Sequence, residues 1–351
     1  MKILLTGGCG FIGSAVVRNL IHATDHSVIN VDCMTYAASP ETVAEVASSS
    51  RYRHVPASIL DAAAMKHLFE THQPDAVMHL AAESHVDRSI DGPGVFMQTN
   101  VMGTCTLLEA AHAYWKGLDN ARQQAFRFHH ISTDEVFGHL GAGDPPFTET
   151  TPYDPRSPYS ASKAASDHLV RAWHHTYGLP TFVTNTTNNY GIWHFPEKLI
   201  PLVTINAIEG RELPVYGKGE NIRDWLFVED HAEALVRAIE RGQPGETYAI
   251  GARQPRTNLQ VVKTICAVLD ELVPDPGGPR ERLIRFVTDR PGHDFRYEID
   301  PTHAEQALEW TARHDFETGI RRTIRWYLDN RAWWEGIRAQ RYTGHRLGTR
   351  A

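Results

Sequence analysis

The sequence has few cysteines and lacks any long apolar run. Its 351 residues include four cysteines (Cys9, Cys33, Cys105 and Cys266), and none of them forms a CxxC pair. Scattered cysteines favour reduced thiols over a disulfide framework. No apolar stretch approaches the ~20 residues that a membrane-spanning helix needs. The first residues, MKILLTGG, also lack the segments of a signal peptide. We therefore expect a cytoplasmic protein without a membrane partner.

The sequence also has no excess of positive charge and no metal-ligand spacing. The formal net charge is −7, which argues against a nucleic-acid partner. The chain has twenty histidines but no HExxH motif and no Cys-His spacing typical of zinc sites. We expect structural histidines and no metal. An anionic ligand would then be held by local arginines and lysines.

Strand-like and helix-like segments alternate through the first half of the chain. This alternation predicts an α/β fold: a Rossmann-type doubly wound parallel sheet, with a smaller, interleaved C-terminal substrate-binding domain. The predicted strands are residues 2–5, 28–32, 75–80, 126–132, 180–186 and 246–250. The predicted helices are residues 12–22, 95–113, 160–177, 228–240, 304–308 and 320–339.

A glycine turn joins the first predicted strand to the first predicted helix. Gly7, Gly10 and Gly13 permit a tight turn whose backbone amides can approach a pyrophosphate at the helix N-terminus. Asp32 ends the next strand, where a carboxylate can bind ribose hydroxyls and repel a 2′-phosphate. A glycine-rich turn without a ligand is the alternative. The complete pattern predicts an NAD site.

The strand–helix alternation loosens after about residue 188, and this change sets the predicted domain boundaries. Residues 1–187 form the NAD-binding Rossmann domain, to which residues 222–250 return. Residues 188–221 and 251–340 form the substrate-binding domain, and residues 341–351 form a tail.

Tyr159 and Lys163 lie four residues apart at the start of a predicted helix, so they share one helix face. The ammonium group of Lys163 can there favour the phenolate of Tyr159. Such a tyrosine can take a hydroxyl proton while hydride leaves the same carbon. Taken alone, the spacing is more typical of an ordinary amphipathic helix start.

Together, the sequence TGGCGFIG at residues 6–13, the Tyr159–Lys163 pair and the segment LAAESHVD at residues 80–87 resemble the extended short-chain dehydrogenase/reductase family. The resemblance implies NAD as cofactor. It implies the following contacts with NAD: Gly7, Gly10, Phe11, Ile12, Gly13, Asp32, Cys33, Met34, Thr35, Ser58, Ile59, Leu80, Ala81, Ala82, Ser84, Thr99, Tyr159, Lys163 and Asn189.

Two adjacent carboxylates, Asp134 and Glu135, follow the predicted strand 126–132. Hydride transfer alone does not need such a pair, but a reaction that also moves a carbon-bound proton and expels water does. A solvated acidic turn is the alternative. The segment STDEV at residues 132–136 resembles the signature of the dTDP-glucose 4,6-dehydratases within the extended family. Further segments agree with it: residues 84–89, 188–191, 195–201, 223–225 and 289–294.

The resemblance to these dehydratases extends from Lys2 to about Tyr327 and implies a mechanism. Tyr159, supported by Lys163, takes the proton of the glucose C4 hydroxyl as hydride passes to NAD. Glu135 then removes the C5 proton, Asp134 protonates the departing C6 hydroxyl, and Thr133 binds the C4 oxygen. NADH then returns its hydride to C6. The net reaction converts dTDP-glucose to dTDP-4-keto-6-deoxyglucose and water. The alternatives are a dehydratase for UDP-glucose, a sugar-nucleotide 4-epimerase and a non-catalytic NAD-binding protein.

The resemblance also implies a sugar-nucleotide site and a homodimer packed through residues 95–113 and 160–177. The arginine side chain suits diphosphate oxygens. The substrate contacts implied are Ser84, Thr133, Asn188, Lys198, Leu199, Pro214, Val215, Tyr216, Arg223, Asn258, Asp289, Arg290 and His293.

A few residues depart from the pattern of these dehydratases. Ser58 replaces an aspartate that faces the adenine amino group, and Phe137 replaces a tyrosine. Ile192-Trp193 and the segment at residues 38–40 also differ. None of these changes removes a catalytic group, but Phe137 and Ile192-Trp193 leave the sugar or base preference open.

Overall fold

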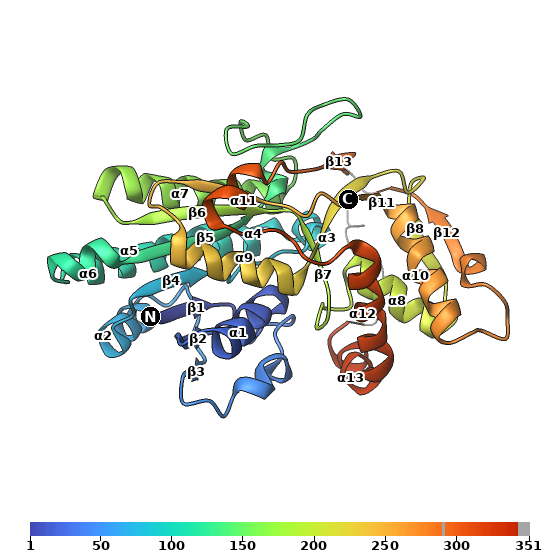
Figure 1. Cartoon of the computed structure of the whole chain (residues 1–351), viewed down its shortest axis with the longest axis horizontal. Coiled ribbons are helices and arrows are strands. Elements are labelled where there is room, and N and C mark those ends of the chain that lie inside the picture. Colours follow the sequence, from blue (N-terminus) through green and yellow to red (C-terminus); the bar gives the residue numbers. More distant parts are fainter. Residues whose placement is uncertain (290–291, 343–351) are drawn as a thin grey trace.

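A computed structural model describes residues 1–289 and 292–342 of the chain (Figure 1). Its centre is a seven-stranded parallel sheet in the order β10-β6-β5-β4-β1-β2-β3. The strands are β1 (Lys2–Thr6), β2 (Ser27–Val31), β3 (Tyr52–Val55), β4 (Ala76–His79), β5 (Arg127–Thr133), β6 (Thr181–Thr186) and β10 (Thr247–Ile250). The crossover order is that of a doubly wound sheet.

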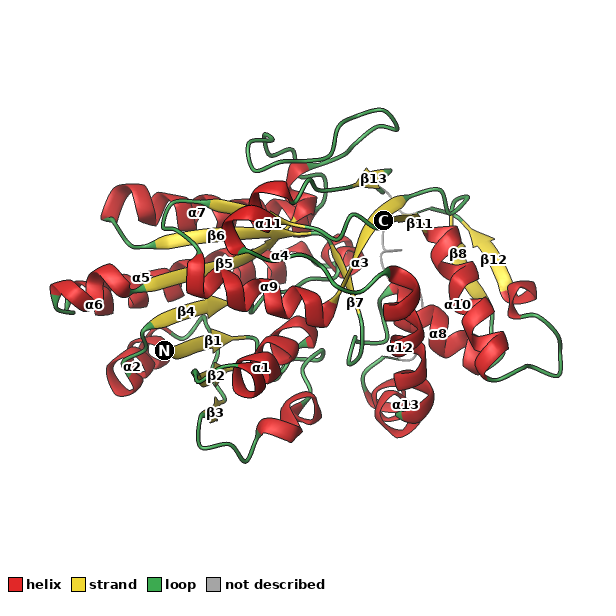
Figure 2. Cartoon of the chain, in the orientation of Figure 1, coloured by secondary structure: helices red, strands yellow, loops and turns green. Residues whose placement is uncertain are grey.

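Helices cover both faces of this sheet, as Figure 2 shows. Alternate residues of a strand point to opposite faces. Ile3 and Leu5 of β1 accordingly pack in one core with α1 (Phe11–Ala23) and α9 (Val228–Arg241). Leu4 of the same strand packs on the other face, in a core with α2 (Ala62–His72), α5 (Gly103–Lys116) and α7 (Pro158–Tyr177). The predicted α/β fold class is therefore confirmed.

The rest of the chain forms two smaller sheets and a second core beside the first, in the right half of Figure 1. One small sheet contains β7 (Asn188–Tyr190), β9 (Ile222–Phe227), β11 (Pro255–Thr257) and β13 (Arg296–Tyr297). The other pairs β8 (Leu213–Tyr216) with β12 (Ile284–Val287). Their helices are α8 (Leu199–Ile208), α10 (Asn258–Leu272), α12 (Phe316–Asp329) and α13 (Arg331–Gln340).

Short helices complete the described chain. The α-helical ones are α3 (Val86–Asp91), α4 (Pro93–Phe96), α6 (Asn120–Ala125) and α11 (Thr302–Leu308). The 3-10 helices are Pro40–Val46, Asp134–Phe137 and Arg280–Leu283, and Met97–Met102 is a π-helix. Within the described residues, no helix is long and apolar enough to cross a membrane.

Two predicted helices differ from the structure. The helix expected at residues 95–113 is α4, the π-helix and α5 in succession, so its hydrogen-bond register changes twice. The helix expected at residues 320–339 is two helices, because the backbone leaves the helical region at Asn330 (φ −115°, ψ 41°). After α13, the Arg341 guanidinium donates to the Ala38 carbonyl and Tyr342 is buried. The remainder of the expected tail, residues 343–351, lies outside the described residues.

Candidate active site

The turn between β1 and α1 has the geometry of a phosphate cradle. Gly7 adopts a positive φ of 77°, and a Cβ on Gly13 would lie 2.1 Å from the Gly7 carbonyl oxygen. Gly10 is the N-cap of α1 and supplies no side-chain cap, so the first amides of the helix are not satisfied by a capping side chain. Helix and strand approach this closely only because glycines stand at these positions.

Asp32 lies directly after β2 and is buried. Its Oδ2 accepts the Cys9 amide at 2.9 Å, and its Oδ1 accepts the Met34 amide at 2.8 Å. These two backbone contacts fix the carboxylate beside the glycine turn. Each oxygen keeps a second acceptor position, so the carboxylate can still bind a ribose hydroxyl.

A cavity of about 350 Å³ opens beyond the carboxyl ends of β1, β4, β5 and β6. Ligands of open α/β sheets bind at this edge. Twenty of the residues singled out from the sequence line it: Phe11, Ile12, Leu80, Ala82, Ser84, Thr133, Asp134, Glu135, Tyr159, Lys163, Asn188, Asn189, Lys198, Leu199, Pro214, Val215, Tyr216, Arg223, Asn258 and His293. The cavity thus joins residues from the large sheet and from the second core.

Other predicted contacts lie outside this lining. They are Gly7, Gly10, Gly13, Asp32, Cys33, Met34, Thr35, Ser58, Ile59, Ala81, Thr99 and Asp289. Asp289 nonetheless reaches the cavity through His293, since its Oδ1 lies 2.6 Å from His293 Nδ1. The Ser58 hydroxyl accepts the Leu60 amide. Arg290 lies outside the described residues.

Asp134 is almost fully buried at the start of the 3-10 helix after β5. The Thr133 hydroxyl donates to its Oδ1 at 3.3 Å, while its Oδ2 has no hydrogen-bond partner. Burial, together with the neighbouring Glu135 carboxylate, raises the pKa of Asp134 to about 8. Asp134 is therefore a protonated acid at neutral pH, as a proton donor requires.

Tyr159 and Lys163 occupy the first turns of α7. Ser157 and Ser160 form a capping box, and Pro158 stands at the first helical position, so the helix start is well defined. Both side chains are buried. The Lys163 Nζ donates to the Ile131 carbonyl at 2.9 Å, and burial lowers the pKa of Lys163 to about 8.

The pKa of Tyr159 differs from the expectation. Burial, and then the negative charge of Glu135, raise the pKa of the Tyr159 phenol above its usual value, while hydrogen bonding with Thr133 lowers it. A tyrosine base therefore needs further positive charge beside it, which a nicotinamide cation carries.

Arg223, on β9, is a buried cation on the cavity wall. Its guanidinium lies 4.1 Å from the centre of the Tyr297 ring and donates to the carbonyls of Ile222, Phe295 and Asp294. Lys198 donates to the Ser84 carbonyl at 2.7 Å, and so bridges the two halves of the cavity wall.

Several lining residues were not identified from the sequence as site residues. They include His194, Glu197, Trp225 and Tyr297. Phe11 stacks on His194 with ring centroids 3.9 Å apart, a contact between residues 183 positions apart. The segments 195–201 and 223–225 were recognised as a whole, and they contain Glu197 and Trp225. Among the described residues, no group of His, Cys, Asp or Glu side chains is placed to hold a metal ion.

Fold and site together define a Rossmann-type enzyme of the dehydratase/epimerase class that acts on sugar nucleotides. The chain belongs to the GDP-mannose 4,6 dehydratase family, whose family model matches residues 4–323. It is 59% identical to a dTDP-glucose 4,6-dehydratase from Escherichia coli and 58% identical to one from Neisseria meningitidis. Each alignment covers 99% of both chains.

Solved structures agree with these relatives. A dTDP-glucose 4,6-dehydratase from Bacillus anthracis in complex with NAD has a TM-score of 0.85 at 38% identity, covering 96% of this chain and 99% of that chain. One from Streptomyces venezuelae has a TM-score of 0.87 at 41% identity, covering 96% and 100%. A UDP-glucose 4-epimerase from Thermotoga maritima is also similar, with a TM-score of 0.81 at 28% identity, covering 94% and 99%. The predicted resemblance to the dehydratases is confirmed.

Proposed function

We propose that this enzyme is an NAD-dependent hydro-lyase that converts dTDP-glucose to dTDP-4-keto-6-deoxyglucose and water. The observation that carries the proposal is the position of the Asp134-Glu135 pair, which lines the same cavity as Tyr159 and Lys163. A 4-epimerase needs the tyrosine and the lysine but has no use for a buried proton donor next to a second carboxylate.

The residues around the glycine turn suit NAD. The turn leaves the N-terminal amides of α1 for a pyrophosphate, and Asp32 is fixed where a ribose would lie. Leu80, Ala82, Asn189 and the Phe11 ring would line the path to the nicotinamide. When bound, NAD supplies a hydride acceptor that returns the hydride within the same turnover.

The roles of the side chains follow from their surroundings. Tyr159 takes the proton of the C4 hydroxyl, with Lys163 as the cation that favours its phenolate. Glu135 removes the C5 proton, which the 4-keto group has made acidic. Asp134 donates its proton to the departing C6 hydroxyl, and the Thr133 hydroxyl binds the C4 oxygen. In the elimination step, the proton that Glu135 takes from C5 and the proton that Asp134 gives to the C6 hydroxyl balance the loss of water. When the hydride returns to C6, a proton is added back at C5, so overall the C4 hydroxyl proton and the C6 hydroxyl leave as water.

The second core would hold the nucleoside diphosphate. The basic side chains of Lys198, Arg223 and His293 line the cavity, and we propose that they bind the diphosphate together with Arg290. Asn188, Leu199, Pro214, Val215, Tyr216 and Asn258 would contact the sugar and the base. The proposed boundary between the two domains lies after residue 187, and residues 222–250 are assigned to the NAD-binding part.

We further propose a homodimer. Its support is a set of large apolar side chains that are exposed on the two predicted dimer segments: Val95, Met97, Met102 and Tyr177. They lie on or beside the predicted dimer segments, residues 95–113 and 160–177. The four free cysteines support a cytoplasmic location, where thiols stay reduced.

A substrate panel tests the proposed reaction. Purified enzyme is incubated with dTDP-glucose and, separately, with UDP-glucose, and the product is identified by mass and by the absorbance of the 4-keto sugar in base. We expect product from dTDP-glucose at a kcat/KM at least tenfold above that for UDP-glucose. If only UDP-glucose gives product, the nucleotide base of the proposed substrate is wrong. If the product is a C4 epimer, the dehydratase mechanism is wrong. The Lys163→Met variant is the matched inactive control.

A further inference from the structure

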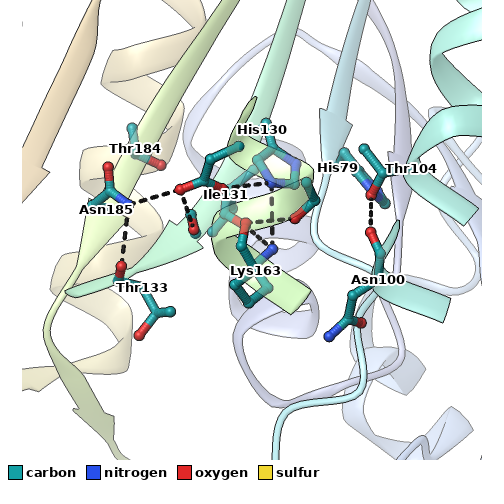
Figure 3. A network of polar contacts seen from close by, with 12 residues as sticks. His79, Asn100, Thr104, His130, Ile131, Thr133, Lys163, Thr184 and Asn185 are labelled. Carbon is teal, nitrogen blue, oxygen red and sulfur yellow. Dashed lines mark hydrogen bonds and ion pairs between the residues drawn. The ribbon is translucent and has the colours of Figure 1, made fainter. Parts of the chain in front are cut away.

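A network of buried polar side chains surrounds Lys163, and Figure 3 shows His130, Thr133 and Asn185 within it. Asp167 is one helical turn after Lys163 on α7, so the two side chains share a helix face. Asp167 and His130 are fully buried. Asp167 does not line the cavity, and the reaction sequence above does not use it.

Four donors surround the Asp167 carboxylate. Its Oδ2 accepts from the Tyr153 hydroxyl at 2.8 Å, the Ser132 hydroxyl at 2.9 Å and the Asn185 amide at 3.2 Å. Its Oδ1 accepts from His130 Nε2 at 3.1 Å. Burial by itself raises the pKa of Asp167, but hydrogen bonding from His130 and the charge of Lys163 outweigh it, so the net direction is down. The carboxylate is therefore ionised in the interior.

His130 stands between this carboxylate and Lys163. Its Nε2 lies 3.1 Å from Asp167 Oδ1 and 3.4 Å from Lys163 Nζ, and its Nδ1 has no partner. Burial, and then the charge of Lys163, lower the pKa of His130 to about 4, so the ring is neutral. A neutral histidine ring whose Nε2 faces a carboxylate carries its proton on Nε2. That nitrogen then cannot accept a hydrogen bond from Lys163. His130 thus fixes the carboxylate without neutralising it.

The negative charge of Asp167 stabilises the buried ammonium group of Lys163. Its ammonium group is buried and donates to one carbonyl, that of Ile131. A buried ammonium without a counter-charge releases its proton. Burial lowers the pKa of Lys163, and the negative charge of Asp167 opposes this change. The titratable groups that face this pair are His130 from β5, His79 from β4, Tyr153 from the preceding loop, and Tyr159 and Arg171 from α7.

The Asp167 carboxylate is also linked by hydrogen bonds to the end of β5, directly before the Asp134-Glu135 pair. Asn185 donates both to Asp167 Oδ2 and to the Thr133 carbonyl, and Ser132 precedes Thr133 in β5. One buried anion is therefore linked to Lys163 on α7 and to the end of β5.

We propose that Asp167 is a positioning residue, which acts with His130 as the fixed counter-charge behind Lys163 and holds the ammonium group toward Tyr159. The inference rests on the proposed function for its kinetic consequence only. Without Asp167, Lys163 would lose its proton at a lower pH, and Tyr159 would lose part of the positive charge that favours its phenolate.

The first test measures the charge of Lys163 directly. Lysine labelled with ¹⁵N and ¹³C in the side chain is observed by NMR in the holoenzyme, which has seven lysines. The Lys163 signal is assigned by its loss in Lys163→Met. We expect Lys163 to be protonated at pH 7 in the wild type. In Asp167→Asn it should lose its proton at a pH lower by about one unit or more, a tenfold change in the protonation equilibrium.

Tyr153→Phe is the matched control, because it removes one hydrogen bond to the same carboxylate and keeps the charge. We expect it to lose stability and to leave the titration of Lys163 unchanged. An unchanged titration in Asp167→Asn would overturn the proposal. So would a Lys163 that is neutral at pH 7 in the wild type, a result that does not depend on whether the variant folds.

The second test follows C4 oxidation alone, in a Glu135→Gln background that stops the reaction after this step. Asp167→Asn should slow the appearance of reduced nicotinamide at least tenfold at pH 7, with KM changed by less than about threefold. As pH rises, the variant should lose this activity at a lower pH than the parent does. An equal loss at every pH, matched by Tyr153→Phe, would mean a merely structural role and overturn the proposal. If the parent does not oxidise dTDP-glucose at all, the proposed function fails while the NMR test still decides on Asp167.

Discussion

The Thr133 hydroxyl donates to Oδ1 of Asp134 at 3.3 Å and leaves Oδ2 of the same carboxyl without a partner. An almost fully buried carboxyl with one unpaired oxygen is costly unless it is protonated. Asp134 therefore carries the proton that the elimination of water needs, and it carries it before substrate binds.

The first prediction concerns this proton. Because the pKa of Asp134 is raised to about 8, its acid form is lost as pH rises through that value, and turnover should fall above about pH 8. Asp134→Asn should lower kcat by ~10²–10⁴-fold, the range for a general acid. C4 oxidation, followed by the absorbance of reduced nicotinamide in a single turnover, should persist. An equal loss of C4 oxidation in the variant would contradict the assignment of Asp134 to the later step.

The second prediction concerns Glu135. In deuterated water, the wild-type product should carry solvent deuterium at C5, because this carboxylate removes the C5 proton and a solvent-derived proton replaces it. Glu135→Gln has the same shape but cannot act as a base, so we expect no deuterium at C5 of recovered sugar and at least a hundredfold loss of turnover. Deuterium at C5 in the variant at the wild-type rate would require another base. Mass spectrometry and NMR of the recovered sugar measure this.

The third prediction is a stability gain from removing a catalytic group. The pKa of Asp134 is about 8 in the folded chain, against a usual value of 3.8. The folded state thus binds one proton more than the unfolded state between these values, and this group's contribution makes stability fall as pH rises through the window. Asp134→Asn removes that slope and should be more stable than the wild type at pH 8, by on the order of 1–3 kcal/mol. Urea unfolding at pH 6 and pH 8 measures it; a wild type that loses no stability relative to the variant over this range would refute the prediction.

The fourth prediction concerns the contact between Phe11 and His194, whose rings are nearly parallel at 7°. Phe11 begins α1 directly after the glycine turn, so the stack connects the proposed cofactor cradle to the segment before α8. Phe11→Ala should cost about 1 kcal/mol or more from the lost stacking and lower NAD retention severalfold. The NAD content per subunit after gel filtration is the measurement. Phe11→Tyr, which keeps the stacked ring, is the control, and equal NAD loss in both variants would disprove the role of the stack.

The sequence revealed those parts of the site that depend on local chain geometry. The glycine turn, the Tyr159–Lys163 spacing and the Asp134-Glu135 pair are each contained within one turn or one helix start, so short motifs were enough to find them. The buried contacts that hold these motifs in place could not be predicted from the sequence. His130 and Asp167 are 37 residues apart, and Phe11 and His194 are 183 apart. Such contacts exist only once the sheet order brings the segments together.

Helix interruptions were missed for a related reason. Buried apolar residues lie on both sides of Met97–Met102 and of Asn330, so the apolar pattern does not show where either helix is interrupted. Periodicity reports which residues face the core, whereas the breaks depend on backbone hydrogen bonds. The Asn330 side chain, for example, donates to the Trp326 carbonyl, where α12 ends.

The central claim is that oxidation at C4 is undone at C6 within one turnover. The most direct measurement uses dTDP-glucose with deuterium at C4 and locates the label in the product by NMR. The account predicts dTDP-4-keto-6-deoxyglucose with the deuterium at C6, carried there on resident NAD. Deuterium found at C4 of an epimerised sugar, or a deoxy product whose C6 has gained only solvent hydrogen, would contradict it.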